Sequence, residues 1–138
     1  MSGVRVVILA DDLIWSTRLV ADARSAGAEP VAVRTVAALV AAVRPDALDD
    51  AAPTIVDLTA RAYDGIEAIA AAARAGAVVL AVGQHDDVAV RKRALAAGAS
   101  RVLAYRKLAD DGPATIRAWL DGAARPAASP PPTEAPAR

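Results

Sequence analysis

The chain has 138 residues, 55% of them apolar, so it can bury one sizeable core but is too short for two ordinary domains. Its 16 Lys and Arg residues balance 16 Asp and Glu residues, which leaves no bulk charge to attract nucleic acid or an anionic membrane surface. The absence of Cys excludes disulfides, thiol nucleophiles and thiolate metal sites, and it fits a reducing compartment, so we expect a cytoplasmic protein.

The N-terminal segment MSGVRVVILADD ends its apolar run in two acids and not at a small-residue cleavage site, so it does not predict a signal peptide. No stretch reaches the roughly 18 uninterrupted apolar residues of a membrane span. We therefore expect no association with a membrane.

Apolar runs and helix-like segments alternate along the chain. Residues 4–10 are Val, Ile, Leu and Ala broken only by Arg5, which is typical of a strand buried on both faces of a parallel sheet. In chain order the pattern then predicts a helix over 14–26, a strand over 29–33, a helix over 36–43, a strand over 54–56, a helix over 66–75, a strand over 78–82, a helix over 88–97, a strand over 101–104 and a helix over 114–124.

Five strands that alternate with five helices predict an α/β fold with right-handed crossovers. The length favours the doubly wound, flavodoxin-like (βα)5 arrangement, a five-stranded parallel sheet of order 2-1-3-4-5, over a full Rossmann domain. Its ligand crevice would lie at the C-terminal ends of the strands.

The last segment, RPAASPPPTEAPAR, differs from the rest because Pro removes backbone donors and little apolar surface remains to offset the entropy of ordering. We therefore expect one folded domain over residues 1–124 and a disordered tail over 125–138. The acidic stretch over 46–53 is expected to be a solvated loop.

Acidic residues follow two strands that are neighbours in this sheet order. Asp11 and Asp12 come directly after the first strand, and Asp57 ends the third. Because the three carboxylates would repel each other at one sheet edge, a hard divalent ion, most plausibly Mg²⁺, is expected to bind there. The alternative is that Asp11 and Asp12 are turn and N-cap residues of the first helix.

Three segments resemble the receiver domains of bacterial response regulators. They are ILADD at the end of the first strand, TIVDLTARAYDG with an Asp-Gly pair seven residues after Asp57, and GAS at 98–100 before the last strand. The resemblance covers about residues 4–124. It implies that Asp57 is the phosphoacceptor, that Asp11 and Asp12 bind Mg²⁺, and that the Thr59 backbone carbonyl is a further ligand.

The sequence departs from the family at the positions that couple phosphorylation to movement, here called the switch positions. Gly83 replaces the Thr or Ser at the end of the fourth strand, and Val102 replaces the aromatic residue that rotates on phosphorylation. Tyr105 and Arg106 stand where the family has Lys and a cis-proline. Arg106 or Lys107 would supply the missing positive charge if the strand bulged by one or two residues; otherwise both are surface charges.

The surface around the pocket offers two further candidates. His85, the only histidine, is expected at the pocket rim. Arg91, Lys92 and Arg93 form a basic patch on the fourth helix, on the face of the fourth helix, fifth strand and fifth helix that receivers use for partners.

We therefore expect a stand-alone, atypical receiver domain that is not an enzyme and acts in two-component phosphorelay signalling. Its partners would be a sensor kinase or a downstream effector, or a second copy in a homodimer. The alternative is an Mg²⁺-dependent phosphatase or phosphotransferase on a related fold, but such enzymes usually carry Asp-x-Asp after the first strand. Dinucleotide binding is disfavoured because ADDLIW lacks a Gly-rich turn.

Overall fold

The structure, a computed structural model, describes residues 4–46, 50–84 and 87–123. The expected tail over 125–138, the last residue of the final predicted helix, and His85 lie outside these described residues. The elements in chain order are β1 (Arg5–Leu9), α1 (Leu13–Ser25), β2 (Glu29–Val33), α2 (Val36–Val43), β3 (Thr54–Asp57), α3 (Gly65–Arg74), β4 (Val79–Gly83), α4 (Val88–Ala97), β5 (Arg101–Ala104) and α5 (Tyr105–Ala123).

The five strands form one parallel sheet in the order β2-β1-β3-β4-β5, which confirms the predicted flavodoxin-like (βα)5 fold. The central strands β3 and β4 are buried along their whole length. Their apolar composition follows from this burial, because helices cover both faces of a parallel sheet.

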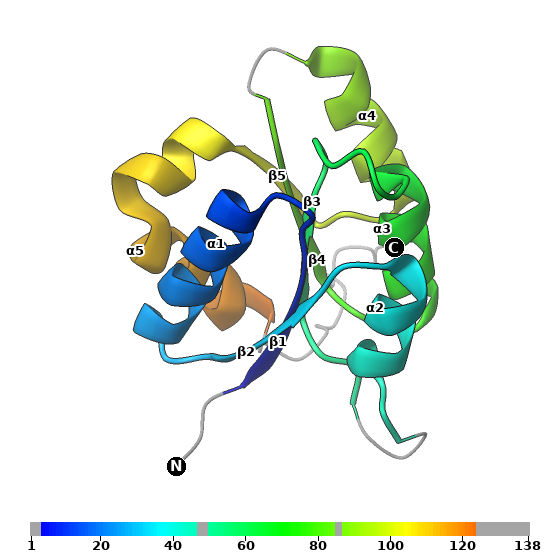
Figure 1. Ribbon diagram of the computed structural model, residues 1–138, viewed down its shortest axis with the longest axis horizontal. Coiled ribbons are helices and arrows are strands. Elements are labelled where there is room, and N and C mark those ends of the chain that lie inside the picture. Colours follow the sequence, from blue (N-terminus) through cyan, green and yellow to red (C-terminus); the bar gives the residue numbers. More distant parts are fainter. Residues whose placement is uncertain (1–3, 47–49, 85–86, 124–138) are drawn as a thin grey trace, which may run out of the picture.

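Two helical layers enclose the sheet, with α1 and α5 on one face and α2, α3 and α4 on the other (Figure 1). Successive strand residues point to opposite faces, so Val7 and Leu9 pack under α2 and α3 whereas Val6 and Ile8 pack under α1 and α5. The two cores are thus separated by one sheet, and the loops at the C-terminal ends of its strands remain available for a site.

Most predicted boundaries lie within one residue of the observed ones, but the predicted start of the last helix is wrong. Helix α5 begins at Tyr105, directly after β5, and not at residue 114. It is interrupted by a kink at Asp111, whose φ of −154° and ψ of 50° are not helical, just before Gly112 and Pro113. The prediction failed because a Gly-Pro pair usually ends a helix, whereas here buried Leu108 anchors a first helical segment before the kink.

Within the described residues, no helix is both long and apolar enough to cross a membrane.

Candidate functional site

The site is built around Asp57, the last residue of the central strand β3. Its side chain is fully buried, with 0% exposure. Oδ1 accepts hydrogen bonds from the Thr59 backbone N–H and the Thr59 hydroxyl, both at 2.9 Å, and from the Tyr105 hydroxyl. Oδ2 is also buried, and no hydrogen-bond partner reaches it. One carboxylate oxygen is therefore saturated with donors and the other has none.

Tyr105 reaches Asp57 from the first turn of α5. Its hydroxyl also lies 2.7 Å from the Thr59 hydroxyl, and its ring stacks on Trp15 of α1, with ring centroids 4.0 Å apart. Burial, together with the hydrogen bond to Asp57, raises the pKa of Tyr105 well above its ordinary value. The hydroxyl is therefore neutral and protonated at any physiological pH, and it acts as a donor to the carboxylate.

Tyr63 connects the C-terminal ends of β1 and β3. Its hydroxyl lies 2.7 Å from the backbone carbonyl of Asp57 and 3.1 Å from that of Leu9. Burial, and next the charge of Asp57, raise the pKa of Tyr63 well above its ordinary value, so this hydroxyl is a donor as well.

The two acids that follow β1 are placed differently from each other. Asp12 is the N-cap of α1, and its Oδ1 accepts the Trp15 backbone N–H at 3.0 Å, as the N-cap alternative predicts. Asp11 is half-buried, and its backbone carbonyl accepts a hydrogen bond from Arg34 at 3.1 Å.

The expected convergence of three carboxylates is not preformed. Across residues 4–46, 50–84 and 87–123, no three His, Cys, Asp or Glu side chains lie close enough together to hold a metal ion. The oxygen donors nevertheless suit a hard cation, because Asp57 Oδ2 has no partner and the Asp12 cap uses only one of its two carboxylate oxygens. The metal assignment to Asp11, Asp12, Asp57 and Thr59 thus stays a prediction that requires side-chain movement.

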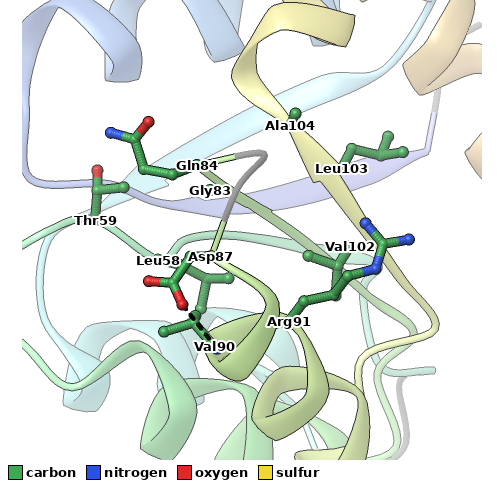
Figure 2. Close-up of a pocket in the computed structure, with 10 residues that line it drawn as sticks. All are labelled: Leu58, Thr59, Gly83, Gln84, Asp87, Val90, Arg91, Val102, Leu103 and Ala104. Carbon is green, nitrogen blue, oxygen red and sulfur yellow. Dashed lines mark hydrogen bonds between the residues drawn. The ribbon is translucent and has the colours of Figure 1, made fainter.

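Beside the Asp57 site, a pocket of about 140 Å³ opens between the C-terminal ends of β4 and β5 and helix α4 (Figure 2). Two of the switch positions, Gly83 and Val102, line it together with Leu58. A side chain at Gly83 would meet the Leu58 side chain, since a Cβ there lies 3.3 Å from its Cδ1. The Gly83 backbone is therefore packed against Leu58, and the open space of the pocket lies beside it.

The other predicted charged residues lie away from the carboxylate. Arg106 and Lys107 are exposed on the first turn of α5, because β5 ends at Ala104 without a bulge, and neither forms a hydrogen bond or ion pair with Asp57. Arg91, Lys92 and Arg93 are exposed on α4, and Arg91 also lines the pocket of Figure 2. The ion pairs of the described chain, Arg18–Asp22 and Arg117–Asp121, involve none of them.

The sequence pattern gave no site role to Trp15 or Tyr63, and it placed Tyr105 where the family has Lys. The structure gives all three a place at the site, because Tyr105 binds the carboxylate, Trp15 supports Tyr105 and Tyr63 holds the strand ends. The available signal was their spacing: Trp15 lies three residues after Asp12, and Tyr63 directly precedes the Asp-Gly pair.

Comparisons with solved structures identify the fold. The signal receiver domain of NarL from Mycobacterium tuberculosis is 25% identical, with a TM-score of 0.70, and the match covers 91% of this chain and 100% of that one. A response regulator receiver domain from Rhodospirillum rubrum is 18% identical, with a TM-score of 0.71 over 86% of this chain and 94% of that one.

A third match is the receiver domain of a sensor histidine kinase from Pseudomonas aeruginosa PAO1, solved with a magnesium ion coordinated in its active-site cleft. It is 18% identical, with a TM-score of 0.69 over 88% of this chain and 98% of that one. No protein-family model matches the sequence, and neither does any curated protein.

The chain therefore has the fold of response-regulator receiver domains, and it spans nearly the whole length of each of these three. Within that fold, Asp57 lies at the C-terminal end of the central strand, where the ligand crevice of such a sheet is found.

Proposed function

We propose that the protein is a cytoplasmic receiver module of two-component signalling, in which Asp57 accepts a phosphoryl group and the output passes through protein contacts. The observation that carries the proposal is the Asp57 carboxylate itself, fully buried at the end of β3 with one oxygen that has no partner. A buried ionisable group with an unpaired oxygen is costly, and functional sites are where such groups cluster.

The reaction transfers a phosphoryl group from a kinase phosphohistidine, or from a small acyl phosphate, to a carboxylate oxygen of Asp57. The bond from phosphorus to the donor breaks, the electron pair leaves with the donor, and an oxygen–phosphorus bond forms. This is a stoichiometric transfer that changes the state of the module, so we do not assign an enzyme activity to the chain.

Mg²⁺ would supply the positive charge that the transfer requires, by neutralising charge that develops on the phosphoryl oxygens. Asp57 Oδ2, the Asp11 and Asp12 carboxylates and the Thr59 backbone carbonyl are the oxygens we assign to it. The proposal is supported by the unpartnered state of Oδ2 and by the magnesium ion in the Pseudomonas aeruginosa receiver domain.

The switch is degenerate in this proposal. Gly83 has no hydroxyl to reach a phosphoryl group, and Val102 is a buried core residue with no ring to rotate. The open pocket between them supports the idea that phosphorylation is not transmitted through this pair.

Output is assigned to the surface formed by α4, β5 and α5. The basic residues Arg91, Lys92 and Arg93 on α4 are exposed and form no ion pair with another residue that the structure describes. We expect them to meet acidic side chains of a sensor kinase, of an effector or of a second copy. An acidic partner surface is the expected complement.

The test is incubation with acetyl phosphate and Mg²⁺ followed by intact mass spectrometry, and titration with beryllofluoride followed by NMR. We expect one phosphoryl group that hydroxylamine removes on the wild type and none on Asp57→Asn. Asp64→Asn is the matched control, because it changes an aspartate that caps α3 outside the pocket and Asn caps a helix equally well.

Equal labelling of the wild type and Asp57→Asn would overturn the proposal, and so would the absence of any Mg²⁺-dependent change around Asp57. Catalytic turnover of a phosphate ester would instead support the phosphatase alternative.

A further inference from the structure

Both oxygens of the Asp57 carboxylate are shielded in the structure. Oδ1 is covered by three donors from Thr59 and Tyr105, and Oδ2 is buried. A phosphoryl donor or a cation cannot reach an atom that has no exposed surface. The observed arrangement is therefore a closed state, and some group must move before Asp57 can react.

Of the donors on Oδ1, Tyr105 is the one that comes from a distant element, and it can leave without disturbing the sheet. The Thr59 N–H belongs to the main chain two residues after Asp57, and the segment is held to β4 by the hydrogen bond from the Leu58 N–H to the Val82 carbonyl, at 2.8 Å. Tyr105 instead reaches the carboxylate by a side chain, from a different element 48 residues away, and it is only partly buried. Rotation of this side chain breaks no backbone hydrogen bond.

Movement of Tyr105 would also change a contact between α1 and α5. Its ring stacks on Trp15, and the Arg18 guanidinium lies 5.8 Å from the centroid of the Trp15 ring. Arg18 in turn donates a hydrogen bond of 3.0 Å to the Ala109 carbonyl of α5. A continuous set of contacts therefore links the Asp57 carboxylate, through Tyr105 and Trp15, to the packing of α1 on α5.

We propose that Tyr105 is a positioning residue that holds Asp57 in a closed state through its hydroxyl, and that its ring couples the state of Asp57 to Trp15 on α1. The phosphoryl-transfer part of this inference depends on the proposed function, whereas the coupling to Trp15 does not. A neutral hydroxyl at this position stabilises the unmodified carboxylate but supplies no positive charge to a phosphoryl group.

The first experiment compares the rates at which acetyl phosphate and Mg²⁺ label the wild type and Tyr105→Phe. Phe keeps the ring and its stack on Trp15 but removes the hydrogen bond that closes the carboxylate. Since hydrogen bonds to charged groups are among the strong ones, we expect Tyr105→Phe to be labelled on the order of tenfold faster. Tyr105→Phe/Asp57→Asn is the control for labelling elsewhere, and circular dichroism checks that each variant is folded.

The second experiment measures the coupling without phosphorylation, from the indole N–H resonances in ¹H–¹⁵N NMR spectra. Asp57→Ala removes the acceptor, so we expect the Trp15 resonance to shift. Asp57→Asn retains an acceptor oxygen and should shift it less. In a Tyr105→Phe background, where the bond is already absent, Asp57→Ala should have little effect on Trp15.

The second tryptophan provides an internal reference. Trp119 donates its indole N–H to the Ser100 hydroxyl at 3.3 Å, just before the start of β5 and so at the opposite end of the sheet from the site. Its resonance should stay in place in all of these variants.

The outcomes separate the two proposals. A rate for Tyr105→Phe equal to or below that of the wild type overturns the closed state as a control on phosphorylation. A Trp15 shift that is absent, or that is the same in the Tyr105→Phe background, overturns the coupling. If no variant with Asp57 is labelled, the proposed function fails, and the Trp15 measurement alone decides the inference.

Discussion

Replacement of Gly98 by Ala tests the junction between α4 and β5, which positions the proposed partner face. Gly98 has a φ of +122°, and a Cβ built on it would lie 2.7 Å from the Cβ of Ala73 in α3. The positive φ costs an L-residue roughly 1–2 kcal/mol. The contact adds about 1–3 kcal/mol of overpacking, because both Cβ atoms are fixed to the backbone and cannot rotate away. Gly98→Ala should therefore lower the free energy of unfolding by roughly 2–5 kcal/mol, mainly through a lower urea midpoint.

A double-mutant cycle separates the two contributions. Ala73→Gly removes the Cβ that Gly98→Ala would meet, so in this background Gly98→Ala should cost only the roughly 1–2 kcal/mol that its positive φ requires. Urea unfolding of the four proteins, followed by circular dichroism, gives both values. If Gly98→Ala costs less than about 0.5 kcal/mol, or costs the same in both backgrounds, the geometric reasoning is refuted.

Three further substitutions test other parts of the molecule. Burial raises the pKa of Asp22 while Arg18, 3.8 Å away, lowers it, so the folded state binds the Asp22 proton more tightly than the unfolded state does. The stability associated with that proton is present below the unfolded pKa and is lost as the pH rises through the folded pKa. Asp22→Asn should therefore stabilise the protein near neutral pH, and this stabilisation should become smaller in acid. A difference in urea midpoint between Asp22→Asn and the wild type that does not change with pH would contradict this. Tyr63→Phe removes the hydroxyl between the ends of β1 and β3 and should cost about 1 kcal/mol in the same assay, whereas an unchanged midpoint would show that water replaces that hydroxyl. Asp64→Ala removes the α3 cap, which accepts the Ile66 and Glu67 N–H groups, and should lower the free energy of unfolding by about 1 kcal/mol. Asp64→Asn should lower it little, and a similar decrease in both variants would argue against capping.

The local pattern of the sequence was sufficient for the fold. The predicted central strands are apolar runs because a parallel sheet covered on both faces buries every residue of these strands, and this leaves a signal in consecutive residues. Helices α2 and α4 and strands β2 and β5 have their predicted boundaries. The position of Asp57 could also be predicted, because the end of an apolar run marks the edge of the sheet where the strands' C-terminal ends meet.

What the sequence left open depended on residues that are distant in the chain. Nothing near Tyr105 indicates that its hydroxyl binds a carboxylate 48 residues away, and that contact exists only because α5 begins immediately after β5 and points its first residue over β3. The early start of α5 could not be predicted either, since Leu108 is the one fully buried side chain before the kink and its burial against the sheet is a tertiary property.

For the acidic residues Asp11, Asp12 and Asp57, too, one part could be predicted from the sequence and another depended on the tertiary structure. Its residue types and its place at two strand ends follow from the sequence, but which oxygens are already engaged does not. Asp12 caps α1 and Asp57 is enclosed by Thr59 and Tyr105, because helix ends and buried carboxylates satisfy their hydrogen-bonding capacity with whichever donors the folded chain brings near them. The sequence by itself thus determined the fold and the location of the candidate acceptor, and only the tertiary structure decided that this acceptor is closed, and by which side chain.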